Sequence, residues 1–133
     1  VAAGEPLSVK QEDIHLQGHA MECRINAEDP AHHFRPCPGV IEAIHLPGGN
    51  GVRIDTAAYN GYEIPPFYDS MIAKVIVHGR TRQEAIDKMR STLGELIIDG
   101  VTTNVDFQYE ILDNEYFQAG EITTDFIPMH FNL

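Results

Sequence analysis

The chain has 133 residues, 43% of them hydrophobic, which is enough for one folded domain with a core of its own. Its formal net charge of −11 argues against a nucleic-acid backbone or an anionic membrane surface as a partner. Two cysteines, Cys23 and Cys37, do not make a disulfide framework, so reduced thiols are expected. We find neither an apolar run of transmembrane length nor a secretion signal, and we expect a cytoplasmic location.

The N-terminal residues have the pattern of a helix end. Residues 1–3 (VAA) favour helix, Gly4 follows them, and Pro6 comes shortly after, which is the order of a helix stop signal. We therefore expect residues 1–13 to be the tail of an upstream element and a linker. A short disordered N-terminus is the alternative that composition leaves open.

Residues 19–28 alternate between two kinds of side chain. One set is mostly apolar and the other is polar: His19, Met21, Cys23, Ile25 and Ala27 against Glu22, Arg24, Asn26 and Glu28. This period of two predicts a half-buried strand with its apolar face toward a core. The polar face meets either water or a site.

Two more regions have strand patterns. Residues 40–46 and 51–56 flank the sequence PGGN, which predicts a hairpin with a Gly-rich turn. The proline-containing segments 29–39 and 60–69 predict loops. Residues 70–78 (SMIAKVIVH) have the strongest strand pattern of the chain.

Helices are predicted after these strands. Thr81 and Glu84 form a capping box, and a helical apolar stripe follows. The stripe consists of Ala85, Ile86, Met89, Leu93, Leu96 and Ile97. Asn104 is expected to cap a second helix that continues to about Leu112, and DNEYFQAG predicts a short third helix that stops at Gly120.

The order of elements predicts the fold class. Strands come first and helices follow, which favours an α+β fold: a mostly antiparallel sheet with a hairpin, followed by two or three helices packed on it. The final segment, ITTDFIPMHFNL (122–133), is apolar enough to dock back on the body.

Common catalytic and metal-binding motifs are missing from the sequence. His32 and His33 are adjacent, so their side chains diverge, and neither H-E-x-x-H nor C-x-x-C occurs; no metal site is expected. PGGNG (47–51) lacks the lysine of a phosphate-binding loop. Cys23 lies on the apolar strand face, which disfavours a reactive thiolate.

Arg24 and Asp69 remain as candidates for chemistry. A surface ion pair of Arg24 with Glu22 or Glu28 is one interpretation, and periodicity by itself favours it. In the other, the carboxylates orient the guanidinium to hold an anion or an enolate-like oxygen. Asp69 precedes the strand at 70–78 and is either a positioned functional group or a residue that caps the strand start.

Several longer runs of the sequence resemble one known family. They are GHAMECRINAEDP, PGVI, PGGNGVRIDT, GYEIPPFYDSMIAKVIVHG, TRQEAIDKM and IDGVTTNVDF. In this order they resemble the C-terminal domain of biotin carboxylase, the ATP-grasp subunit or domain of acetyl-CoA carboxylase and related biotin-dependent carboxylases. The resemblance implies that residues 1–13 are the tail of the preceding ATP-grasp domain and a linker, and that residues 14–133 are the C-terminal domain.

The resemblance also implies an activity. The whole enzyme would be an ATP-dependent carbon–nitrogen ligase that carboxylates biotin on its carrier protein with ATP and bicarbonate. The family's ATP loop, metal-binding glutamates and bicarbonate-binding segment have no counterpart here, so upstream domains would bind ATP and Mg²⁺. We expect this chain alone to hold no cofactor and to be inactive, with biotin arriving on a carrier.

Three kinds of site residue follow from the resemblance. The arginine of the family's ECRI motif corresponds to Arg24, which would bind and stabilise the biotin ureido oxygen. Glu22 and Asn26 would orient Arg24, which is our own inference. The aspartate of the YDSM motif, Asp69, would lie near biotin.

Partners are implied in the same way. Arg53 matches a position in the family's homodimer interface, while Asn50 stands where relatives often have an aromatic anchor. The expected partners are the upstream ATP-grasp domains, a biotin carboxyl carrier protein, a carboxyltransferase and a second copy; nucleic acid and membrane are not expected.

Other functions stay open. A non-catalytic dimerisation or scaffold module of a carboxylase is the main alternative, and the role of Arg24 separates the two. The run ECRINAEDP argues against a purine-biosynthesis carboxylase. The sequence does not decide between acetyl-CoA carboxylase, with its role in fatty acid biosynthesis, and pyruvate or propionyl-CoA carboxylase.

Overall fold

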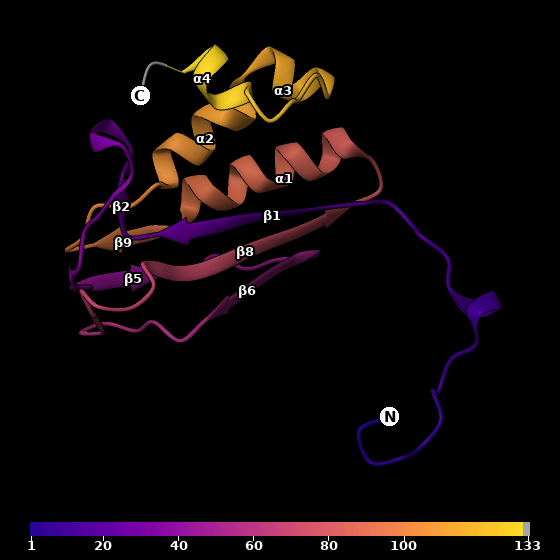
Figure 1. The fold of residues 1–133 in the computed structure, drawn as a ribbon. Coiled ribbons are helices and arrows are strands. Elements are labelled where there is room, and N and C mark those ends of the chain that lie inside the picture. Colours follow the sequence, from indigo (N-terminus) through magenta and orange to yellow (C-terminus); the bar gives the residue numbers. More distant parts are fainter. Residues whose placement is uncertain (132–133) are drawn as a thin grey trace.

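The computed structural model describes residues 1–131. Antiparallel strands form the lower layer in Figure 1 and helices lie above them, which confirms the α+β class. The elements in chain order are η1 (Gln11–Asp13), β1 (His19–Asn26), β2 (Glu28–Asp29), η2 (Pro30–His32), β3 (Arg35–Pro36), β4 (Gly39–Val40), β5 (Ala43–His45), β6 (Val52–Thr56), β7 (Glu63–Ile64), β8 (Met71–Gly79), α1 (Arg82–Glu95), β9 (Ile97–Asp99), α2 (Val105–Asp113), α3 (Glu115–Ala119) and α4 (Phe126–His130).

The main sheet has three strands in the order β1-β8-β6, and both pairings are antiparallel. The predicted alternation of β1 is confirmed, because Cys23, Ile25 and the following Ala27 are buried while Glu22 and Arg24 are exposed. The central strand β8 buries Val75 and Val77 completely. One face of the sheet is therefore core and the other is open.

Helix α1 covers the apolar face of the sheet. It packs against β8 and β1, and its stripe of Ala85, Ile86, Met89 and Leu93 is almost entirely buried. Helix α2 packs on α1, and α3 packs on α2 (Figure 1). The tail docks through Phe126, which is 5% exposed, as predicted for this segment; its last two residues, 132–133, lie outside the described residues.

The predicted hairpin around PGGN is wrong. Strand β5 pairs with β9, and β6 pairs with β8, so the two flanking segments do not pair with each other. In the observed register Val52 and Ile54 of β6 lie opposite Val77 and Val75 of β8. These two apolar contacts belong to a ladder of five residue pairs, and the ladder outweighs the local turn preference of the glycines.

The helix predicted after Thr81 is too long, because its apolar stripe was expected to continue to Ile97 and the helix to end at Asp99-Gly100. Helix α1 ends at Glu95, and Ile97 begins β9, where Ile98 lies opposite Ile44. The apolar residues of the short strand β9 continue the helical spacing of the sequence, although β-branched isoleucines favour extended backbone. The short third helix is confirmed, with Gly120 at φ 82° as its C-terminal stop.

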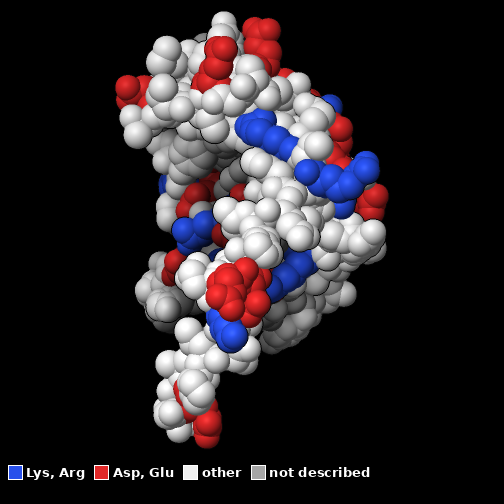
Figure 2. All heavy atoms as spheres, turned by 90° about the vertical axis from the view of Figure 1, so that its right-hand side faces the viewer, with Lys and Arg blue, Asp and Glu red and all other residues white. Residues whose placement is uncertain are grey.

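Residues 1–18 extend away from the body of the domain (Figure 1). All of them are exposed, and the carbonyl of Gln17 touches the body through His78 Nε2 at 2.9 Å. On the face in Figure 2, acidic and basic side chains are interspersed and do not form one large patch of a single sign. Within residues 1–131, no helix combines the length and hydropathy that a membrane span requires.

Candidate functional site

The open face of the main sheet brings charged side chains into rows. Arg24 on β1 lies opposite Lys74 on β8, and Lys74 lies opposite Asp55 on β6. In the neighbouring row, Ile76 of β8 separates Glu22 from Arg53. Because adjacent strands are about 4.8 Å apart, Arg24 and Asp55 start on the order of 10 Å from each other. The rows form a polar surface on the side of the sheet away from α1.

The guanidinium of Arg24 is exposed on this surface. None of the ion pairs and side-chain hydrogen bonds among residues 1–131 involves it, so the surface pairing with Glu22 or Glu28 is not formed in this structure. Five N–H groups are thus available to an acceptor from outside the domain. The orienting role of Glu22 and Asn26 stays a prediction.

Asn26 takes part in a different network at the end of β1. Its Nδ2 donates to Glu28 Oε1 at 3.2 Å, and Ser70 Oγ donates to the same oxygen at 2.5 Å. The backbone N–H of Ala27 donates to the Ser70 carbonyl at 2.7 Å, which fixes the strand end to the start of β8. Asn26 Oδ1 is buried and has no partner among the described residues.

Asn104 does not cap helix α2 with its side chain, contrary to the sequence prediction. Its Oδ1 accepts the backbone N–H of Asn26 at 2.9 Å, and its Nδ2 donates to the Arg24 carbonyl at 3.1 Å. The residue does stand at the position before the helix, where asparagine is common. The side chain of Asn104 therefore bonds the backbone of the neighbouring strand edge instead of the backbone N–H groups at the start of α2.

Asp69 lies in the exposed loop just before β8. Its Oδ1 accepts the backbone N–H of Met71 at 2.8 Å, which is the strand-start arrangement that the sequence left as an alternative. Ser70 lies beside Ala27, so Asp69 stands about four positions along the ladder from Arg24, on the order of 13 Å in extended strands. Among residues 1–131, no hydrogen bond or ion pair joins the two side chains.

Arg53 binds Asp55 on its own strand. Nε and Nη2 of Arg53 donate to the two carboxylate oxygens of Asp55, both at 2.8 Å. The hydrogen bond from Arg53 lowers the pKa of Asp55, and the charges of Arg53 and Lys74 add to the effect. The arginine side chain is 72% exposed and sits on an edge strand, as a residue in an interface would.

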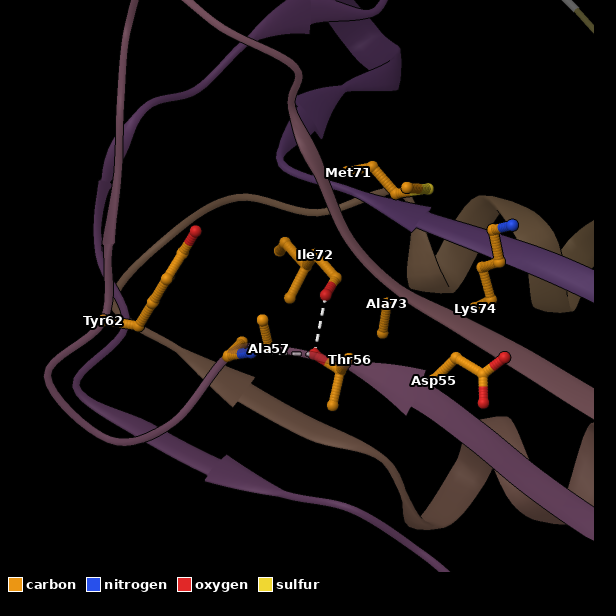
Figure 3. Close-up of a pocket in the computed structure, with 9 residues that line it drawn as sticks. Asp55, Thr56, Ala57, Tyr62, Met71, Ile72, Ala73 and Lys74 are labelled. Atoms are coloured by element: carbon orange, nitrogen blue, oxygen red, sulfur yellow. Dashed lines mark hydrogen bonds between the residues drawn. The ribbon is translucent and has the colours of Figure 1, made fainter. Parts of the chain in front are cut away.

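A shallow cavity of about 270 Å³ opens beside these charges. Figure 3 shows Asp55 and Lys74 at one end of it and Tyr62 at the other. Thr56 Oγ1 donates to the Ile72 carbonyl at 2.7 Å and ties β6 to β8 at the cavity wall. The cavity extends the polar surface toward the loop at 57–62.

Two chemistries find no support in the described residues. Burial raises the pKa of the Cys23 thiol to about 12, and the charge of Glu22 adds to this, so a thiolate nucleophile is disfavoured at neutral pH. Residues 1–131 contain no group of three His, Cys, Asp or Glu side chains placed to hold a metal ion.

Sequence reasoning did not place three residues in this region, although it named one of them, Asn104, as a helix cap. Lys74 is a single charge within an apolar strand, a signal that was available in SMIAKVIVH. Asp55 and Asn104 gave no comparable signal, because their importance depends on pairings over 19 and 78 positions of sequence.

Comparison with known proteins identifies close relatives of the chain. The family model for the biotin carboxylase C-terminal domain matches residues 22–129. Biotin carboxylase 1 of Bacillus subtilis is 54% identical over 130 residues, which are 98% of this chain and 29% of the relative. A pyruvate carboxylase subunit of Methanothermobacter thermautotrophicus is 54% identical over 127 residues, 96% of this chain and 26% of that protein.

A solved structure has the same fold. It is the biotin carboxylase domain dimer of Hydrogenobacter thermophilus 2-oxoglutarate carboxylase, in complex with MgADP, ADP and bicarbonate. The TM-score is 0.95 at 46% identity, over 97% of this chain and 28% of the solved one. The chain thus spans between a quarter and a third of the length of these relatives.

Proposed function

This chain belongs to the biotin carboxylase C-terminal domain family, and we propose that it is the C-terminal part of an enzyme that uses ATP and bicarbonate to carboxylate biotin on a carrier protein. Its relatives include biotin carboxylases and a pyruvate carboxylase subunit, so the acceptor of the carboxyl group is not part of the proposal. As in those proteins, the rest of the enzyme lies outside the matched segment.

The exposed, unpaired guanidinium of Arg24 carries the proposal. Its strand has one face in the core and the other toward the open side, and within residues 1–131 no carboxylate neutralises it. In a water-excluded site, a guanidinium offers fixed charged donors to an oxygen on which negative charge develops. Arg24 would donate to the biotin ureido oxygen, and bound biotin supplies the nitrogen that accepts the carboxyl group.

The described residues fit biotin better than a metal nucleotide. Arg24 suits a ureido oxygen, whereas residues 1–131 offer no acidic cluster for Mg²⁺. We therefore assign ATP and Mg²⁺ to the upstream domains, and to this domain the positioning of the acceptor oxygen. Asp69 and the cavity between Asp55 and Tyr62 adjoin this surface and are candidates for contacts with biotin or its carrier.

The test is biotin-dependent ATP cleavage, with bicarbonate, in the full-length enzyme. Arg24→Ala should lower turnover by about 10²–10³-fold, because a placed donor to the developing charge is lost. Arg24→Lys keeps the charge but loses the planar fork, and it should recover only part of the rate. Arg80→Ala is a matched control, since its side chain is 91% exposed and pairs with Glu84 beyond the far end of β8.

Unchanged turnover in Arg24→Ala would leave this domain as a scaffold. The alternative, a non-catalytic dimerisation module, predicts equal rates for the Arg24 and Arg80 variants. A lower rate is attributed to chemistry only where circular dichroism and nucleotide binding match those of the unmodified enzyme.

A further inference from the structure

One residue, Asn104, bonds part of the edge of β1 that faces away from β8. In the order β1-β8-β6, strand β1 has β8 on one side and no strand on the other. Asn104 fills that place: its side-chain amide bonds the Arg24 carbonyl and the Asn26 N–H, and its backbone N–H donates to the Asn26 carbonyl at 3.2 Å. A single residue thus makes three hydrogen bonds to the backbone on either side of Ile25.

Asn104 is itself held firmly. It is 5% exposed, and its carbonyl accepts the N–H of Gln108 at 3.0 Å, the first backbone bond of α2. Helix α2 packs against α1 and β1, so Asn104 connects the strand to the helical layer. The hydrogen bonds of Asn104 meet β1 at the point where the β1–β8 ladder has a register irregularity, between Ile25 and Asn26. Such irregularities bend a strand and leave backbone groups without ladder partners.

These bonds matter for Arg24, because they fix the backbone from which its side chain projects. The guanidinium makes no hydrogen bond within residues 1–131, so its position follows from the backbone that carries it. A displacement of about 1 Å at a reacting group can cost on the order of 100-fold in rate. We infer that Asn104 is a positioning residue for Arg24, an inference that rests on the function proposed above.

The experiment is a double-mutant cycle in the full-length enzyme. Turnover and the KM for free biotin are measured for the unmodified protein, Asn104→Ala, Arg24→Ala and the double variant. Asn104→Ala should lower kcat by about 10–100-fold. The same substitution should cost little further rate when Arg24 is already alanine, because the misplaced group is no longer present.

Two further variants separate positioning from folding. Asn104→Asp keeps the size and the acceptor for the Asn26 N–H, but replaces the donor to the Arg24 carbonyl with an oxygen; it should also lower kcat. Asn114→Ala is the matched control, because Asn114 caps α3 by accepting from the N–H groups of Tyr116 and Phe117. It should lower the unfolding midpoint while turnover at low temperature is kept.

The possible outcomes separate this inference from the proposed function. Normal turnover in a folded Asn104→Ala or Asn104→Asp, with a large loss in Arg24→Ala, overturns this inference alone. Equal rate losses from Asn104→Ala in the unmodified protein and in Arg24→Ala would show that Asn104 acts independently of Arg24. This result would also overturn the inference. Normal turnover in Arg24→Ala overturns the proposed function. If Asn104→Ala does not fold, the aspartate variant decides.

Discussion

The two cysteines of the chain illustrate how burial sets the chemistry of a single residue. Cys23 is 5% exposed on the core side of β1, and its pKa is raised from 9.0 to about 12. The folded state therefore holds this proton more tightly than the unfolded state. Its contribution to stability is complete below pH 9.0 and declines as the pH rises toward 12. Cys37 lies in the loop before β4 and is partly exposed.

We expect iodoacetamide to distinguish these thiols. At pH 8 the thiolate fraction of Cys23 is about 10⁻⁴, and the sheet also shields its sulfur. Cys37 should be alkylated in the native chain while Cys23 stays unmodified, as measured by mass spectrometry of peptides. In urea, both should react. Equal labelling of both cysteines in native protein would show that β1 opens readily, against the buried position described here.

At the scale of elements, two glycines near the end of α1 differ in whether the backbone around them requires a glycine. Gly100, after β9, has φ +97°, and an added Cβ would lie 2.3 Å from the Val40 carbonyl oxygen. Gly94 lies in α1 with ordinary backbone and open space around it. The first glycine is required by the turn, whereas the second only adds flexibility to the unfolded chain.

Alanine substitutions should therefore change stability in opposite directions. Gly100→Ala should destabilise the domain by about 2–4 kcal/mol, from strain and the clash with the backbone. Gly94→Ala should stabilise it by about 0.5–1 kcal/mol. Urea unfolding followed by circular dichroism measures both values. A neutral Gly100→Ala would mean that the β5–β9 pair can shift at low cost.

The elements that the sequence predicted are those with local signals. The alternation in β1, the apolar run of β8, the Thr81 cap and the Gly120 stop are properties of neighbouring residues, and all appear in the structure. The failures concern partners distant in sequence. Neither the β5–β9 pairing nor the bond from Asn104 to the Arg24 strand has a local signature, because both are selected by tertiary packing.

The same limit applies to the candidate site. Arg24 and Asp69 were candidates from the strand pattern, and a family resemblance gave them roles; the structure adds that Arg24 lies on β1 and Asp69 in the loop before β8. The row of Arg24, Lys74 and Asp55 required the register of two separate ladders. Composition carries no information on register, so this part of the polar surface could not be predicted.

At the scale of the whole molecule, the segment 1–18 is exposed along its whole length. We propose that residues 1–13 are the tail and linker of a preceding ATP-grasp domain, and that residues 14–133 are the C-terminal domain. Exposed apolar side chains in the segment support this: Leu7 is 71% and Leu16 101% exposed.

We propose a second copy as the other neighbour, and Arg53 provides the test. A relative crystallised as a biotin carboxylase domain dimer, and Arg53 lies exposed on edge strand β6, next to the turn that holds Asn50. In the full-length protein, Arg53→Ala should weaken the dimer. Asn50→Phe should lower its Kd by about 10–100-fold, because burying a phenyl ring contributes about 1.5–3 kcal/mol.

Sedimentation equilibrium of the full-length protein measures both changes. Arg80→Ala is the control, because within residues 1–131 the ion pair of this arginine is with Glu84 at the start of α1. Arg53→Ala has a second effect, because Asp55 loses its bidentate partner. The carboxylate of Asp55 is then unpaired, and its charge would repel the second copy. The double variant Arg53→Ala/Asp55→Ala removes this repulsion. If it dimerises as weakly as Arg53→Ala, the arginine itself contacts the second copy. If it recovers the original Kd, the exposed carboxylate of Asp55 caused the effect and Arg53 itself makes no contact with the second copy.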